Sequence, residues 1–121
     1  VYNMVKDFKA RGIPIDGVGL QTHSAGDYPG TGAEIGANIK RLVDLGVKVE
    51  ITELDVVDAP NGDQPGRYAE LGKACKDNGC SGVTTWGLYD GATWLSGRNP
   101  LLLDGNFQQK PAYTSLFNAI K

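Results

Sequence analysis

The amino-acid sequence predicts an α/β fold in which helices alternate with strands of a parallel sheet. Three glycines mark this alternation. Each follows a helix-like stretch and precedes a short apolar run, and they are spaced by 34 and 33 residues, at Gly12, Gly46 and Gly79. Helix-to-strand connections are short, whereas strand-to-helix connections are long, covering about 21–33, 54–66 and 87–110. This asymmetry places the functional loops at the carboxyl ends of the strands, as in a (β/α) barrel or an open doubly wound sheet.

The expected helices carry apolar residues at intervals of three and four. Glycine commonly ends a helix because it reaches the left-handed conformation without a Cβ clash. A fourth helix is expected over 111–120, with Pro111 in its first turn. The four apolar stripes are Val1, Met4, Val5 and Phe8; Ile35, Ile39, Leu42 and Val43; Tyr68, Leu71 and Cys75; and Tyr113, Leu116, Phe117 and Ile120.

Three strands are expected, over 15–20, 47–52 and 82–86. Three strands do not close a barrel, which needs eight, and they leave two strand edges unpaired. We therefore expect the 121 residues to be part of a larger protein. The alternatives are that copies of the chain associate, or that the fold is a small open sheet.

The composition is that of a globular protein, with 40% hydrophobic and 21% charged residues. The net charge is −2 and the basic residues are scattered, which argues against a nucleic-acid partner or an anionic membrane surface. No stretch approaches the roughly 20 apolar residues of a membrane span. We expect neither nucleic acid nor membrane as a partner.

Two cysteines, Cys75 and Cys80, are separated by four residues. This spacing suits a small disulfide loop or two free thiols near one turn. One cysteine pair with a distant histidine makes a poor zinc site, so no metal is expected. The disulfide is the favoured interpretation, and it would indicate an oxidising, secreted setting.

The polar residues that could take part in a reaction lie at the predicted strand ends. Because side chains alternate along a strand, Gln21 and His23 are expected on one face of the first strand. On the second strand, Ile51, Glu53 and Asp55 are expected to share a face, with Glu50 pointing the other way. A carboxylate that follows apolar Val49 and Ile51 to the barrel mouth needs donors, which His23 and Gln21 provide. Such a carboxylate suits a nucleophile that attacks an anomeric carbon.

Simpler interpretations of the same residues remain open at this point. The two carboxylates are also typical of a solvated rim or a helix N-cap, and a lone histidine is often a structural hydrogen-bonding group. Trp86 fits a core position, and Trp94 fits a loop that packs on a neighbouring loop. Loop tryptophans also suit sugar binding, because the apolar face of a pyranose stacks on an indole.

Four segments together resemble the xylanases of glycoside hydrolase family 10. They are Gly-Val-Gly-Leu-Gln-Thr-His (17–23), Ile-Thr-Glu-Leu-Asp (51–55), Val-Thr-Thr-Trp-Gly (83–87) and Pro-Leu-Leu-Leu-Asp-Gly-Asn (100–106). The resemblance covers essentially the whole chain. It implies a (β/α)₈ TIM barrel of which this chain supplies about the last three βα units, with 1–121 forming the C-terminal part of a single catalytic domain.

The resemblance also implies site residues. Glu53 corresponds to the nucleophile of a retaining endo-β-1,4-xylanase, and His23 and Asp55 to the pair that orients it. The Cys-x4-Cys pair also occurs in family members, which supports the disulfide. Substrate contacts are implied for Gln21, Trp86 and Trp94.

The acid/base glutamate of that family follows the fourth strand, which precedes anything in this chain. We therefore expect the isolated chain to be inactive. If it were active, the second carboxylate would be sought among Asp27, Asp55, Asp58 and Asp90. The expected partners are xylan or a xylo-oligosaccharide and the N-terminal part of the barrel. No cofactor is expected, because two carboxylates suffice for the reaction.

Two further hypotheses differ in class. One is a non-catalytic, self-associating half-barrel that binds xylan or another polysaccharide. The other is an α/β protein in which Glu53 and His23 serve a different hydrolysis, such as that of an ester. Within the glycosidase interpretation, a cellulase or glucanase of similar fold is the nearest competitor.

Overall fold

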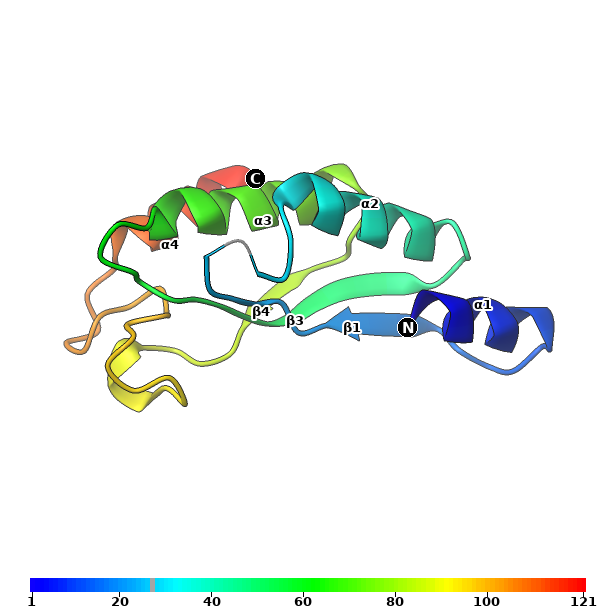
Figure 1. Ribbon diagram of the computed structural model, residues 1–121, viewed down its shortest axis with the longest axis horizontal. Coiled ribbons are helices and arrows are strands. Elements are labelled where there is room, and N and C mark those ends of the chain that lie inside the picture. The colour runs from blue at the N-terminus through cyan, green and yellow to red at the C-terminus, as the bar shows by residue number, and fades with distance from the viewer. Residues whose placement is uncertain (27) are drawn as a thin grey trace.

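The computed structural model describes residues 1–26 and 28–121. Three helices, α2 (Gly32–Val43), α3 (Gln64–Asp77) and α4 (Pro111–Ile120), cover one face of a parallel sheet (Figure 1). None of these three helices lies on the opposite face in this view. The predicted alternation of helices and parallel strands is confirmed.

The sheet is built around one long strand, β3 (Lys48–Val56). β1 (Gly17–Leu20) and then β2 (His23–Ser24) pair with successive parts of β3, and β4 (Val83–Thr85) also pairs with it. All of these pairings are parallel. Between β1 and β2 the extended conformation of the strand is interrupted at Thr22, which has a φ of 61°.

A bulge in β3 changes which side chains face the helices. Ile51 pairs with Val83 and Leu54 with Thr85, so three steps along β3 match two along β4. Ile51 before the bulge and Leu54 after it are both fully buried in the core. An extra residue between them shifts the alternation of side chains by one position.

The bulge corrects the expected faces of this strand. Glu53 and Asp55 do share a face, where both contact His23. Val49 and Ile51 do not lie on that face, because they pack in the core with the helices. Glu50 was expected on the opposite face from Glu53. It lies instead on the open face of the sheet, the face away from the helices, to which the bulge also turns Glu53. Strict alternation fails here because it does not include the bulge.

The core lies between β3 and the helices. Tyr68, Ile39, Leu42 and Leu71 are completely buried in it, so the predicted stripes of α2 and α3 are the faces that pack on the sheet. The stripes of the outer helices are only partly buried. The first helix, α1 (Tyr2–Ala10), buries Val5, and α4 buries Ala112 and Leu116.

Three helices are followed by the predicted glycines. Gly12, Gly46 and Gly79 come after α1, α2 and α3, and their φ values are 68°, 79° and 78°. A side chain with a Cβ is strained in this conformation, whereas glycine is not. These glycines therefore allow the chain to turn sharply from each helix toward the next strand.

Cys75 and Cys80 form the predicted disulfide. Their Cα atoms are 4.7 Å apart, and the bond links the last turn of α3 to the segment that leads into β4. Both cysteines of the chain are used, which rules out the free-thiol and metal alternatives.

Tyr68 joins α3 to the last long loop. Its hydroxyl donates a hydrogen bond of 2.6 Å to the carbonyl of Pro100. Burial, with Asp55 and Asp90 nearby, raises the pKa of Tyr68 well above its usual range, so the hydroxyl keeps its proton. The hydrogen bond thereby attaches the loop at Pro100 to the hydrophobic core.

We expect Tyr68→Phe to lower the free energy of unfolding by about 1 kcal/mol, because the Pro100 carbonyl loses one of its two donors and keeps only the Val56 amide at 3.0 Å. Urea denaturation of the chain measures this. Tyr113→Phe is the control, because the Tyr113 hydroxyl makes no hydrogen bond within the described residues. Equal losses in the two variants would contradict the role given to the Tyr68 hydroxyl.

Candidate active site

The loops that follow the strands gather at one end of the sheet (Figure 1). His23 lies on β2, Glu53 and Asp55 lie near the carboxyl end of β3, and Trp86 follows β4 directly. Parallel strands bring their carboxyl ends to the same edge of a sheet, so residues distant in the sequence meet there. The candidate residues therefore lie at the strand ends, where the sequence placed them.

The imidazole ring of His23 lies between two carboxylates. Its Nε2 is 3.1 Å from Oε2 of Glu53, and its Nδ1 is 3.0 Å from Oδ2 of Asp55. β2 and β3 set this arrangement, because their register places His23 directly beside Asp55. When both ring nitrogens carry hydrogen, one positive group donates to two negative ones.

The two carboxylates have different surroundings. Asp55 is completely buried, whereas the side chain of Glu53 is 20% exposed. The other oxygen of Glu53, Oε1, accepts no hydrogen bond from the described residues. A partly exposed carboxylate with one oxygen held and the other without a hydrogen-bond donor is suited to nucleophilic attack.

Two tryptophans stand beside the imidazole of His23. The Trp94 ring centroid is 5.1 Å from that of His23, and the Trp86 centroid is 6.4 Å away, both in edge-on geometry. Both indoles are substantially exposed. Their flat apolar surfaces next to a carboxylate form an arrangement that can hold a sugar ring.

Gln21 lies in the interruption between β1 and β2, and its side chain is exposed. Within the described residues it donates no hydrogen bond to Glu53 or Asp55. The expectation that Gln21 supplies a donor to the carboxylate is therefore wrong in this structure. The left-handed conformation of Thr22 breaks the simple alternation on which that expectation rested.

The long loop that carries Trp94 is anchored by residues that sequence reasoning missed. Asp90, in the short helix η1 (Asp90–Ala92), accepts from Lys110 Nζ at 2.9 Å and from the Leu101 amide at 2.7 Å. The carbonyl of Asn99 accepts from Lys110 Nζ at 2.6 Å and from Gln64 Nε2 at 2.7 Å. An ion pair between loop residues this far apart has no recognisable sequence pattern.

A second missed group holds β2 in place. Arg67, on α3, donates to Ser24 Oγ at 3.0 Å and to the carbonyl of Gly30 at 2.5 Å. It also pairs with Glu70 at 2.7 Å, and Glu70 accepts from the Gly32 amide at the start of α2. Because Ser24 adjoins His23, α3 fixes the strand on which His23 lies.

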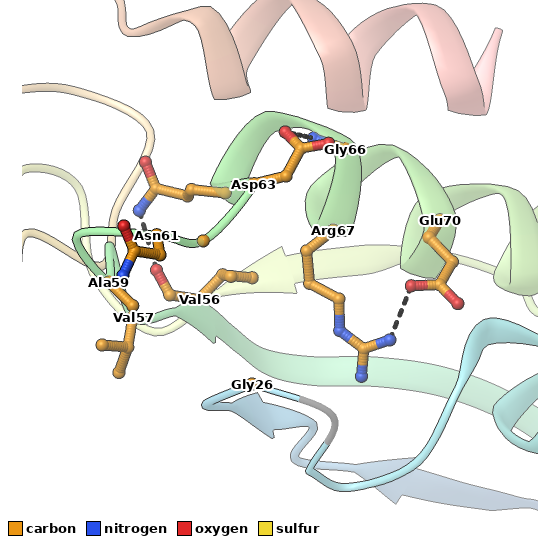
Figure 2. A pocket seen from close by; sticks show the side chains of 11 residues that line it. Gly26, Val56, Val57, Ala59, Asn61, Asp63, Gly66, Arg67 and Glu70 are labelled. Atoms are coloured by element: carbon orange, nitrogen blue, oxygen red, sulfur yellow. Dashed lines mark hydrogen bonds and ion pairs between the residues drawn. The ribbon is translucent and has the colours of Figure 1, made fainter.

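Figure 2 shows the cavity into which Arg67 and Glu70 point. Its volume is about 570 Å³, and Gly26, Val57 and Asn61 also line it. A smaller cavity of about 180 Å³ is lined by His23 and Asp55 together with Trp94. His23 and Asp55 therefore border the smaller cavity and not the larger one, and Val57 lines both.

Three of the four carboxylates considered from the sequence can be located in the described residues, and none of the three is arranged as a partner for Glu53. Asp90 is engaged by Lys110, and Asp58 is exposed on the loop after β3. Asp55 is buried behind His23. Asp27 lies outside the described residues.

Two further observations concern the part of the chain that the structure describes. No group of three or more His, Cys, Asp or Glu side chains is arranged to hold a metal ion. No helix there is long and apolar enough to cross a membrane.

Comparison with known proteins gives consistent matches along the chain. Residues 1–119 match the family described as glycosyl hydrolase family 10. The endo-β-1,4-xylanase Xyn10C of Cellvibrio japonicus is 40% identical, over 98% of this chain and 25% of that protein. The endo-1,4-β-xylanase B of Neocallimastix patriciarum is 41% identical, over 100% of this chain and 14% of that protein.

Solved structures agree with these matches. Native xylanase 10C from Cellvibrio japonicus superposes with a TM-score of 0.87 and 38% identity, over 98% of this chain and 31% of that one. Xylanase 10B from Thermotoga maritima gives 0.85 and 32%, over 98% of this chain and 40% of that one. The chain thus spans less than half of each of these relatives, and its fold is a segment of their (β/α)₈ barrel.

The Arg67–Glu70 group gives a testable pH dependence. The hydrogen bond from the Gly32 amide holds the pKa of Glu70 below its usual value of 4.5; burial opposes this shift, and Arg67 adds smaller lowering contributions. Ionised Glu70 therefore stabilises the fold fully above that usual value, and the contribution is lost as the pH falls through the lower folded-state pKa. Because the side chain is 43% exposed, the contribution is below about 1 kcal/mol.

We expect the difference in free energy of unfolding between the chain and Glu70→Gln to be largest near neutral pH. It should shrink toward zero in acid. Urea denaturation at a series of pH values from about 7 to about 3 measures it. A difference that stays constant over this range would show that the charge of Glu70 does not contribute.

Proposed function

Because the chain belongs to glycosyl hydrolase family 10, we propose that it supplies the nucleophile half of the active site of an endo-β-1,4-xylanase. The observation that carries this proposal is the position of Glu53. Its carboxylate is held by His23 at the carboxyl end of β3, its side chain is 20% exposed, and its other oxygen accepts no hydrogen bond from the described residues. The names of the relatives supply the substrate class.

The proposed reaction proceeds with retention in two steps. Glu53 attacks the anomeric carbon and forms an ester with it while the glycosidic C–O bond breaks. The leaving sugar oxygen takes a proton from a glutamic acid that lies outside this chain. Water then attacks the anomeric carbon, gives a proton back to that glutamate, and releases Glu53 as a carboxylate.

Roles for the other site residues follow from their contacts. His23 and Asp55 are proposed to orient Glu53, because the ring joins both carboxylates. Trp86 and Trp94 are proposed to line the sugar site beside it. Gln21, exposed near the same edge, is proposed to contact the sugar rather than the carboxylate.

The proposed ligands are xylan and xylo-oligosaccharides. Xylanase 10C from Cellvibrio japonicus in complex with xylopentaose superposes on this chain with a TM-score of 0.86. The missing barrel strands are the proposed structural partner, and the reaction needs no cofactor. The disulfide between Cys75 and Cys80 supports a secreted protein.

One observation favours a second candidate function. The open face of the sheet, lined by Lys48, Glu50 and Thr52, borders a hollow of about 310 Å³. A second copy of the chain covering this face would give a self-associating half-barrel that binds polysaccharide without cleaving it. The mass of the chain in solution, with and without xylan, distinguishes this from the enzyme fragment.

We expect the purified chain to release no reducing sugar from xylan by itself. Mixing it with the N-terminal half of a family 10 xylanase, ending after the fifth strand, should restore hydrolysis. Glu53→Ala in the mixture should reduce the rate by several orders of magnitude, because no nucleophile remains. Asp44→Ala, which removes a surface carboxylate at the end of α2, is the matched control and should retain activity.

Parallel assays on cellulose and mixed-linkage glucan test the nearest competing substrates. An assay on an ester substrate tests the alternative that Glu53 and His23 serve ester hydrolysis. Activity of the chain alone would contradict the requirement for an external acid. Equal activity of Glu53→Ala and Asp44→Ala in the mixture would contradict the role of Glu53.

A further inference from the structure

The buried carboxylate of Asp55 has two donors, and both bind the same oxygen. His23 Nδ1 lies 3.0 Å from Oδ2, and Trp94 Nε1 donates to Oδ2 at 2.8 Å. The second oxygen, Oδ1, has no hydrogen-bond partner within the described residues. Among the described residues, Trp94 therefore supplies one of the two hydrogen bonds to a carboxylate with no exposed surface.

A charge removed from water depends strongly on each of its donors, because no solvent replaces a donor that is lost. Hydrogen bonds to charged groups are also the stronger ones in proteins. If the Trp94 bond were absent, Asp55 would be held by His23 alone. The orientation of the His23 ring would then depend on a less firmly placed carboxylate.

The loop around Trp94 is built to keep this bond in place. On one side, Asp90 is held by Lys110 and by the Leu101 amide. On the other side, the carbonyl of Asn99 accepts two hydrogen bonds, and that residue adopts a φ of 44°. Trp94 lies between these two anchors, so its indole is not on a free loop tip.

We propose that Trp94 is a positioning residue for Glu53, acting through Asp55 and His23. Four side chains form the connection: the Trp94 indole N–H, the Asp55 carboxylate, the His23 imidazole and the Glu53 carboxylate. The proposal rests on the proposed function and deepens it. A sugar that stacks on Trp94 also steadies the indole, and the nucleophile is thereby aligned when the site is occupied.

This role is separable from stacking. Phenylalanine at position 94 keeps an aromatic face for the sugar but has no N–H to donate. Because the Trp94 side chain is mostly exposed, Trp94→Phe leaves no cavity in the core. The chain also contains an internal reference, since its other tryptophan, Trp86, makes no indole hydrogen bond within the described residues.

The first test is independent of activity. In a ¹⁵N-labelled chain the two tryptophans give two indole N–H signals, which Trp94→Phe and Trp86→Phe assign. Exposure is 62% for Trp94 and 48% for Trp86, so exposure alone predicts that Trp94 exchanges with water at least as fast. The hydrogen bond predicts the reverse, with exchange of Trp94 roughly tenfold slower or more. Asp55→Asn should shift the Trp94 signal and leave that of Trp86 in place.

The second test uses the chain completed by the N-terminal barrel half. We expect Trp94→Phe to lower kcat roughly tenfold to a hundredfold with little change in KM, the size expected for one hydrogen bond to a charged group. In an Asp55→Asn background the same substitution should have almost no further effect, because the connection is already broken.

Three outcomes would overturn the proposal. They are equal or faster exchange of the Trp94 N–H, a raised KM with unchanged kcat, and full additivity of the two substitutions. An inactive mixture with slow Trp94 exchange would instead count against the proposed function alone, because the exchange measurement does not require hydrolysis.

Discussion

The Asp55 side chain is completely buried, and the rest of the site is arranged around the donors that it needs. A carboxylate removed from water is costly unless hydrogen-bonding groups replace the lost solvent. One donor, His23, comes from the neighbouring strand, and the other, Trp94, comes from a loop beyond the next strand. His23 then has its second nitrogen left for Glu53. The satisfaction of one buried charge thus brings three separate segments together beside Glu53, the proposed nucleophile.

The bulge in β3 makes this arrangement compatible with a packed core. Val49 and Ile51 face the helices, so an uninterrupted strand would direct Glu53 and Asp55 toward the same apolar layer. The extra residue ahead of Leu54 turns both carboxylates to the open face while Leu54 returns to the core. One irregular step therefore separates the chemical side of the strand from its structural side, as bulges near active sites often do.

The supporting contacts come mainly from α3. Tyr68 and Gln64 hold the backbone of the last loop, and Arg67 holds Ser24 next to His23. The same helix that packs on β3 therefore also fixes β2 and the last long loop. This explains how the surroundings of Glu53, the proposed nucleophile, are organised within a segment that spans less than half of its relatives. In the proposed function, the remaining barrel strands cover the open face of the sheet and supply the acid that lies outside this chain.

The sequence by itself determined the local features, because glycine conformations and apolar periodicity act over a few residues. Gly12, Gly46 and Gly79, the buried stripes of α2 and α3, and the Cys75–Cys80 bond were all predicted from such patterns. The four family segments also indicated which residues meet at the strand ends. Only the tertiary structure decided the bulge, the exposed position of Gln21, the anchors of the last loop, and the indole bond to Asp55. Each of these depends on backbone register or on contacts between segments far apart in the chain, and neither leaves a periodic signal in the sequence.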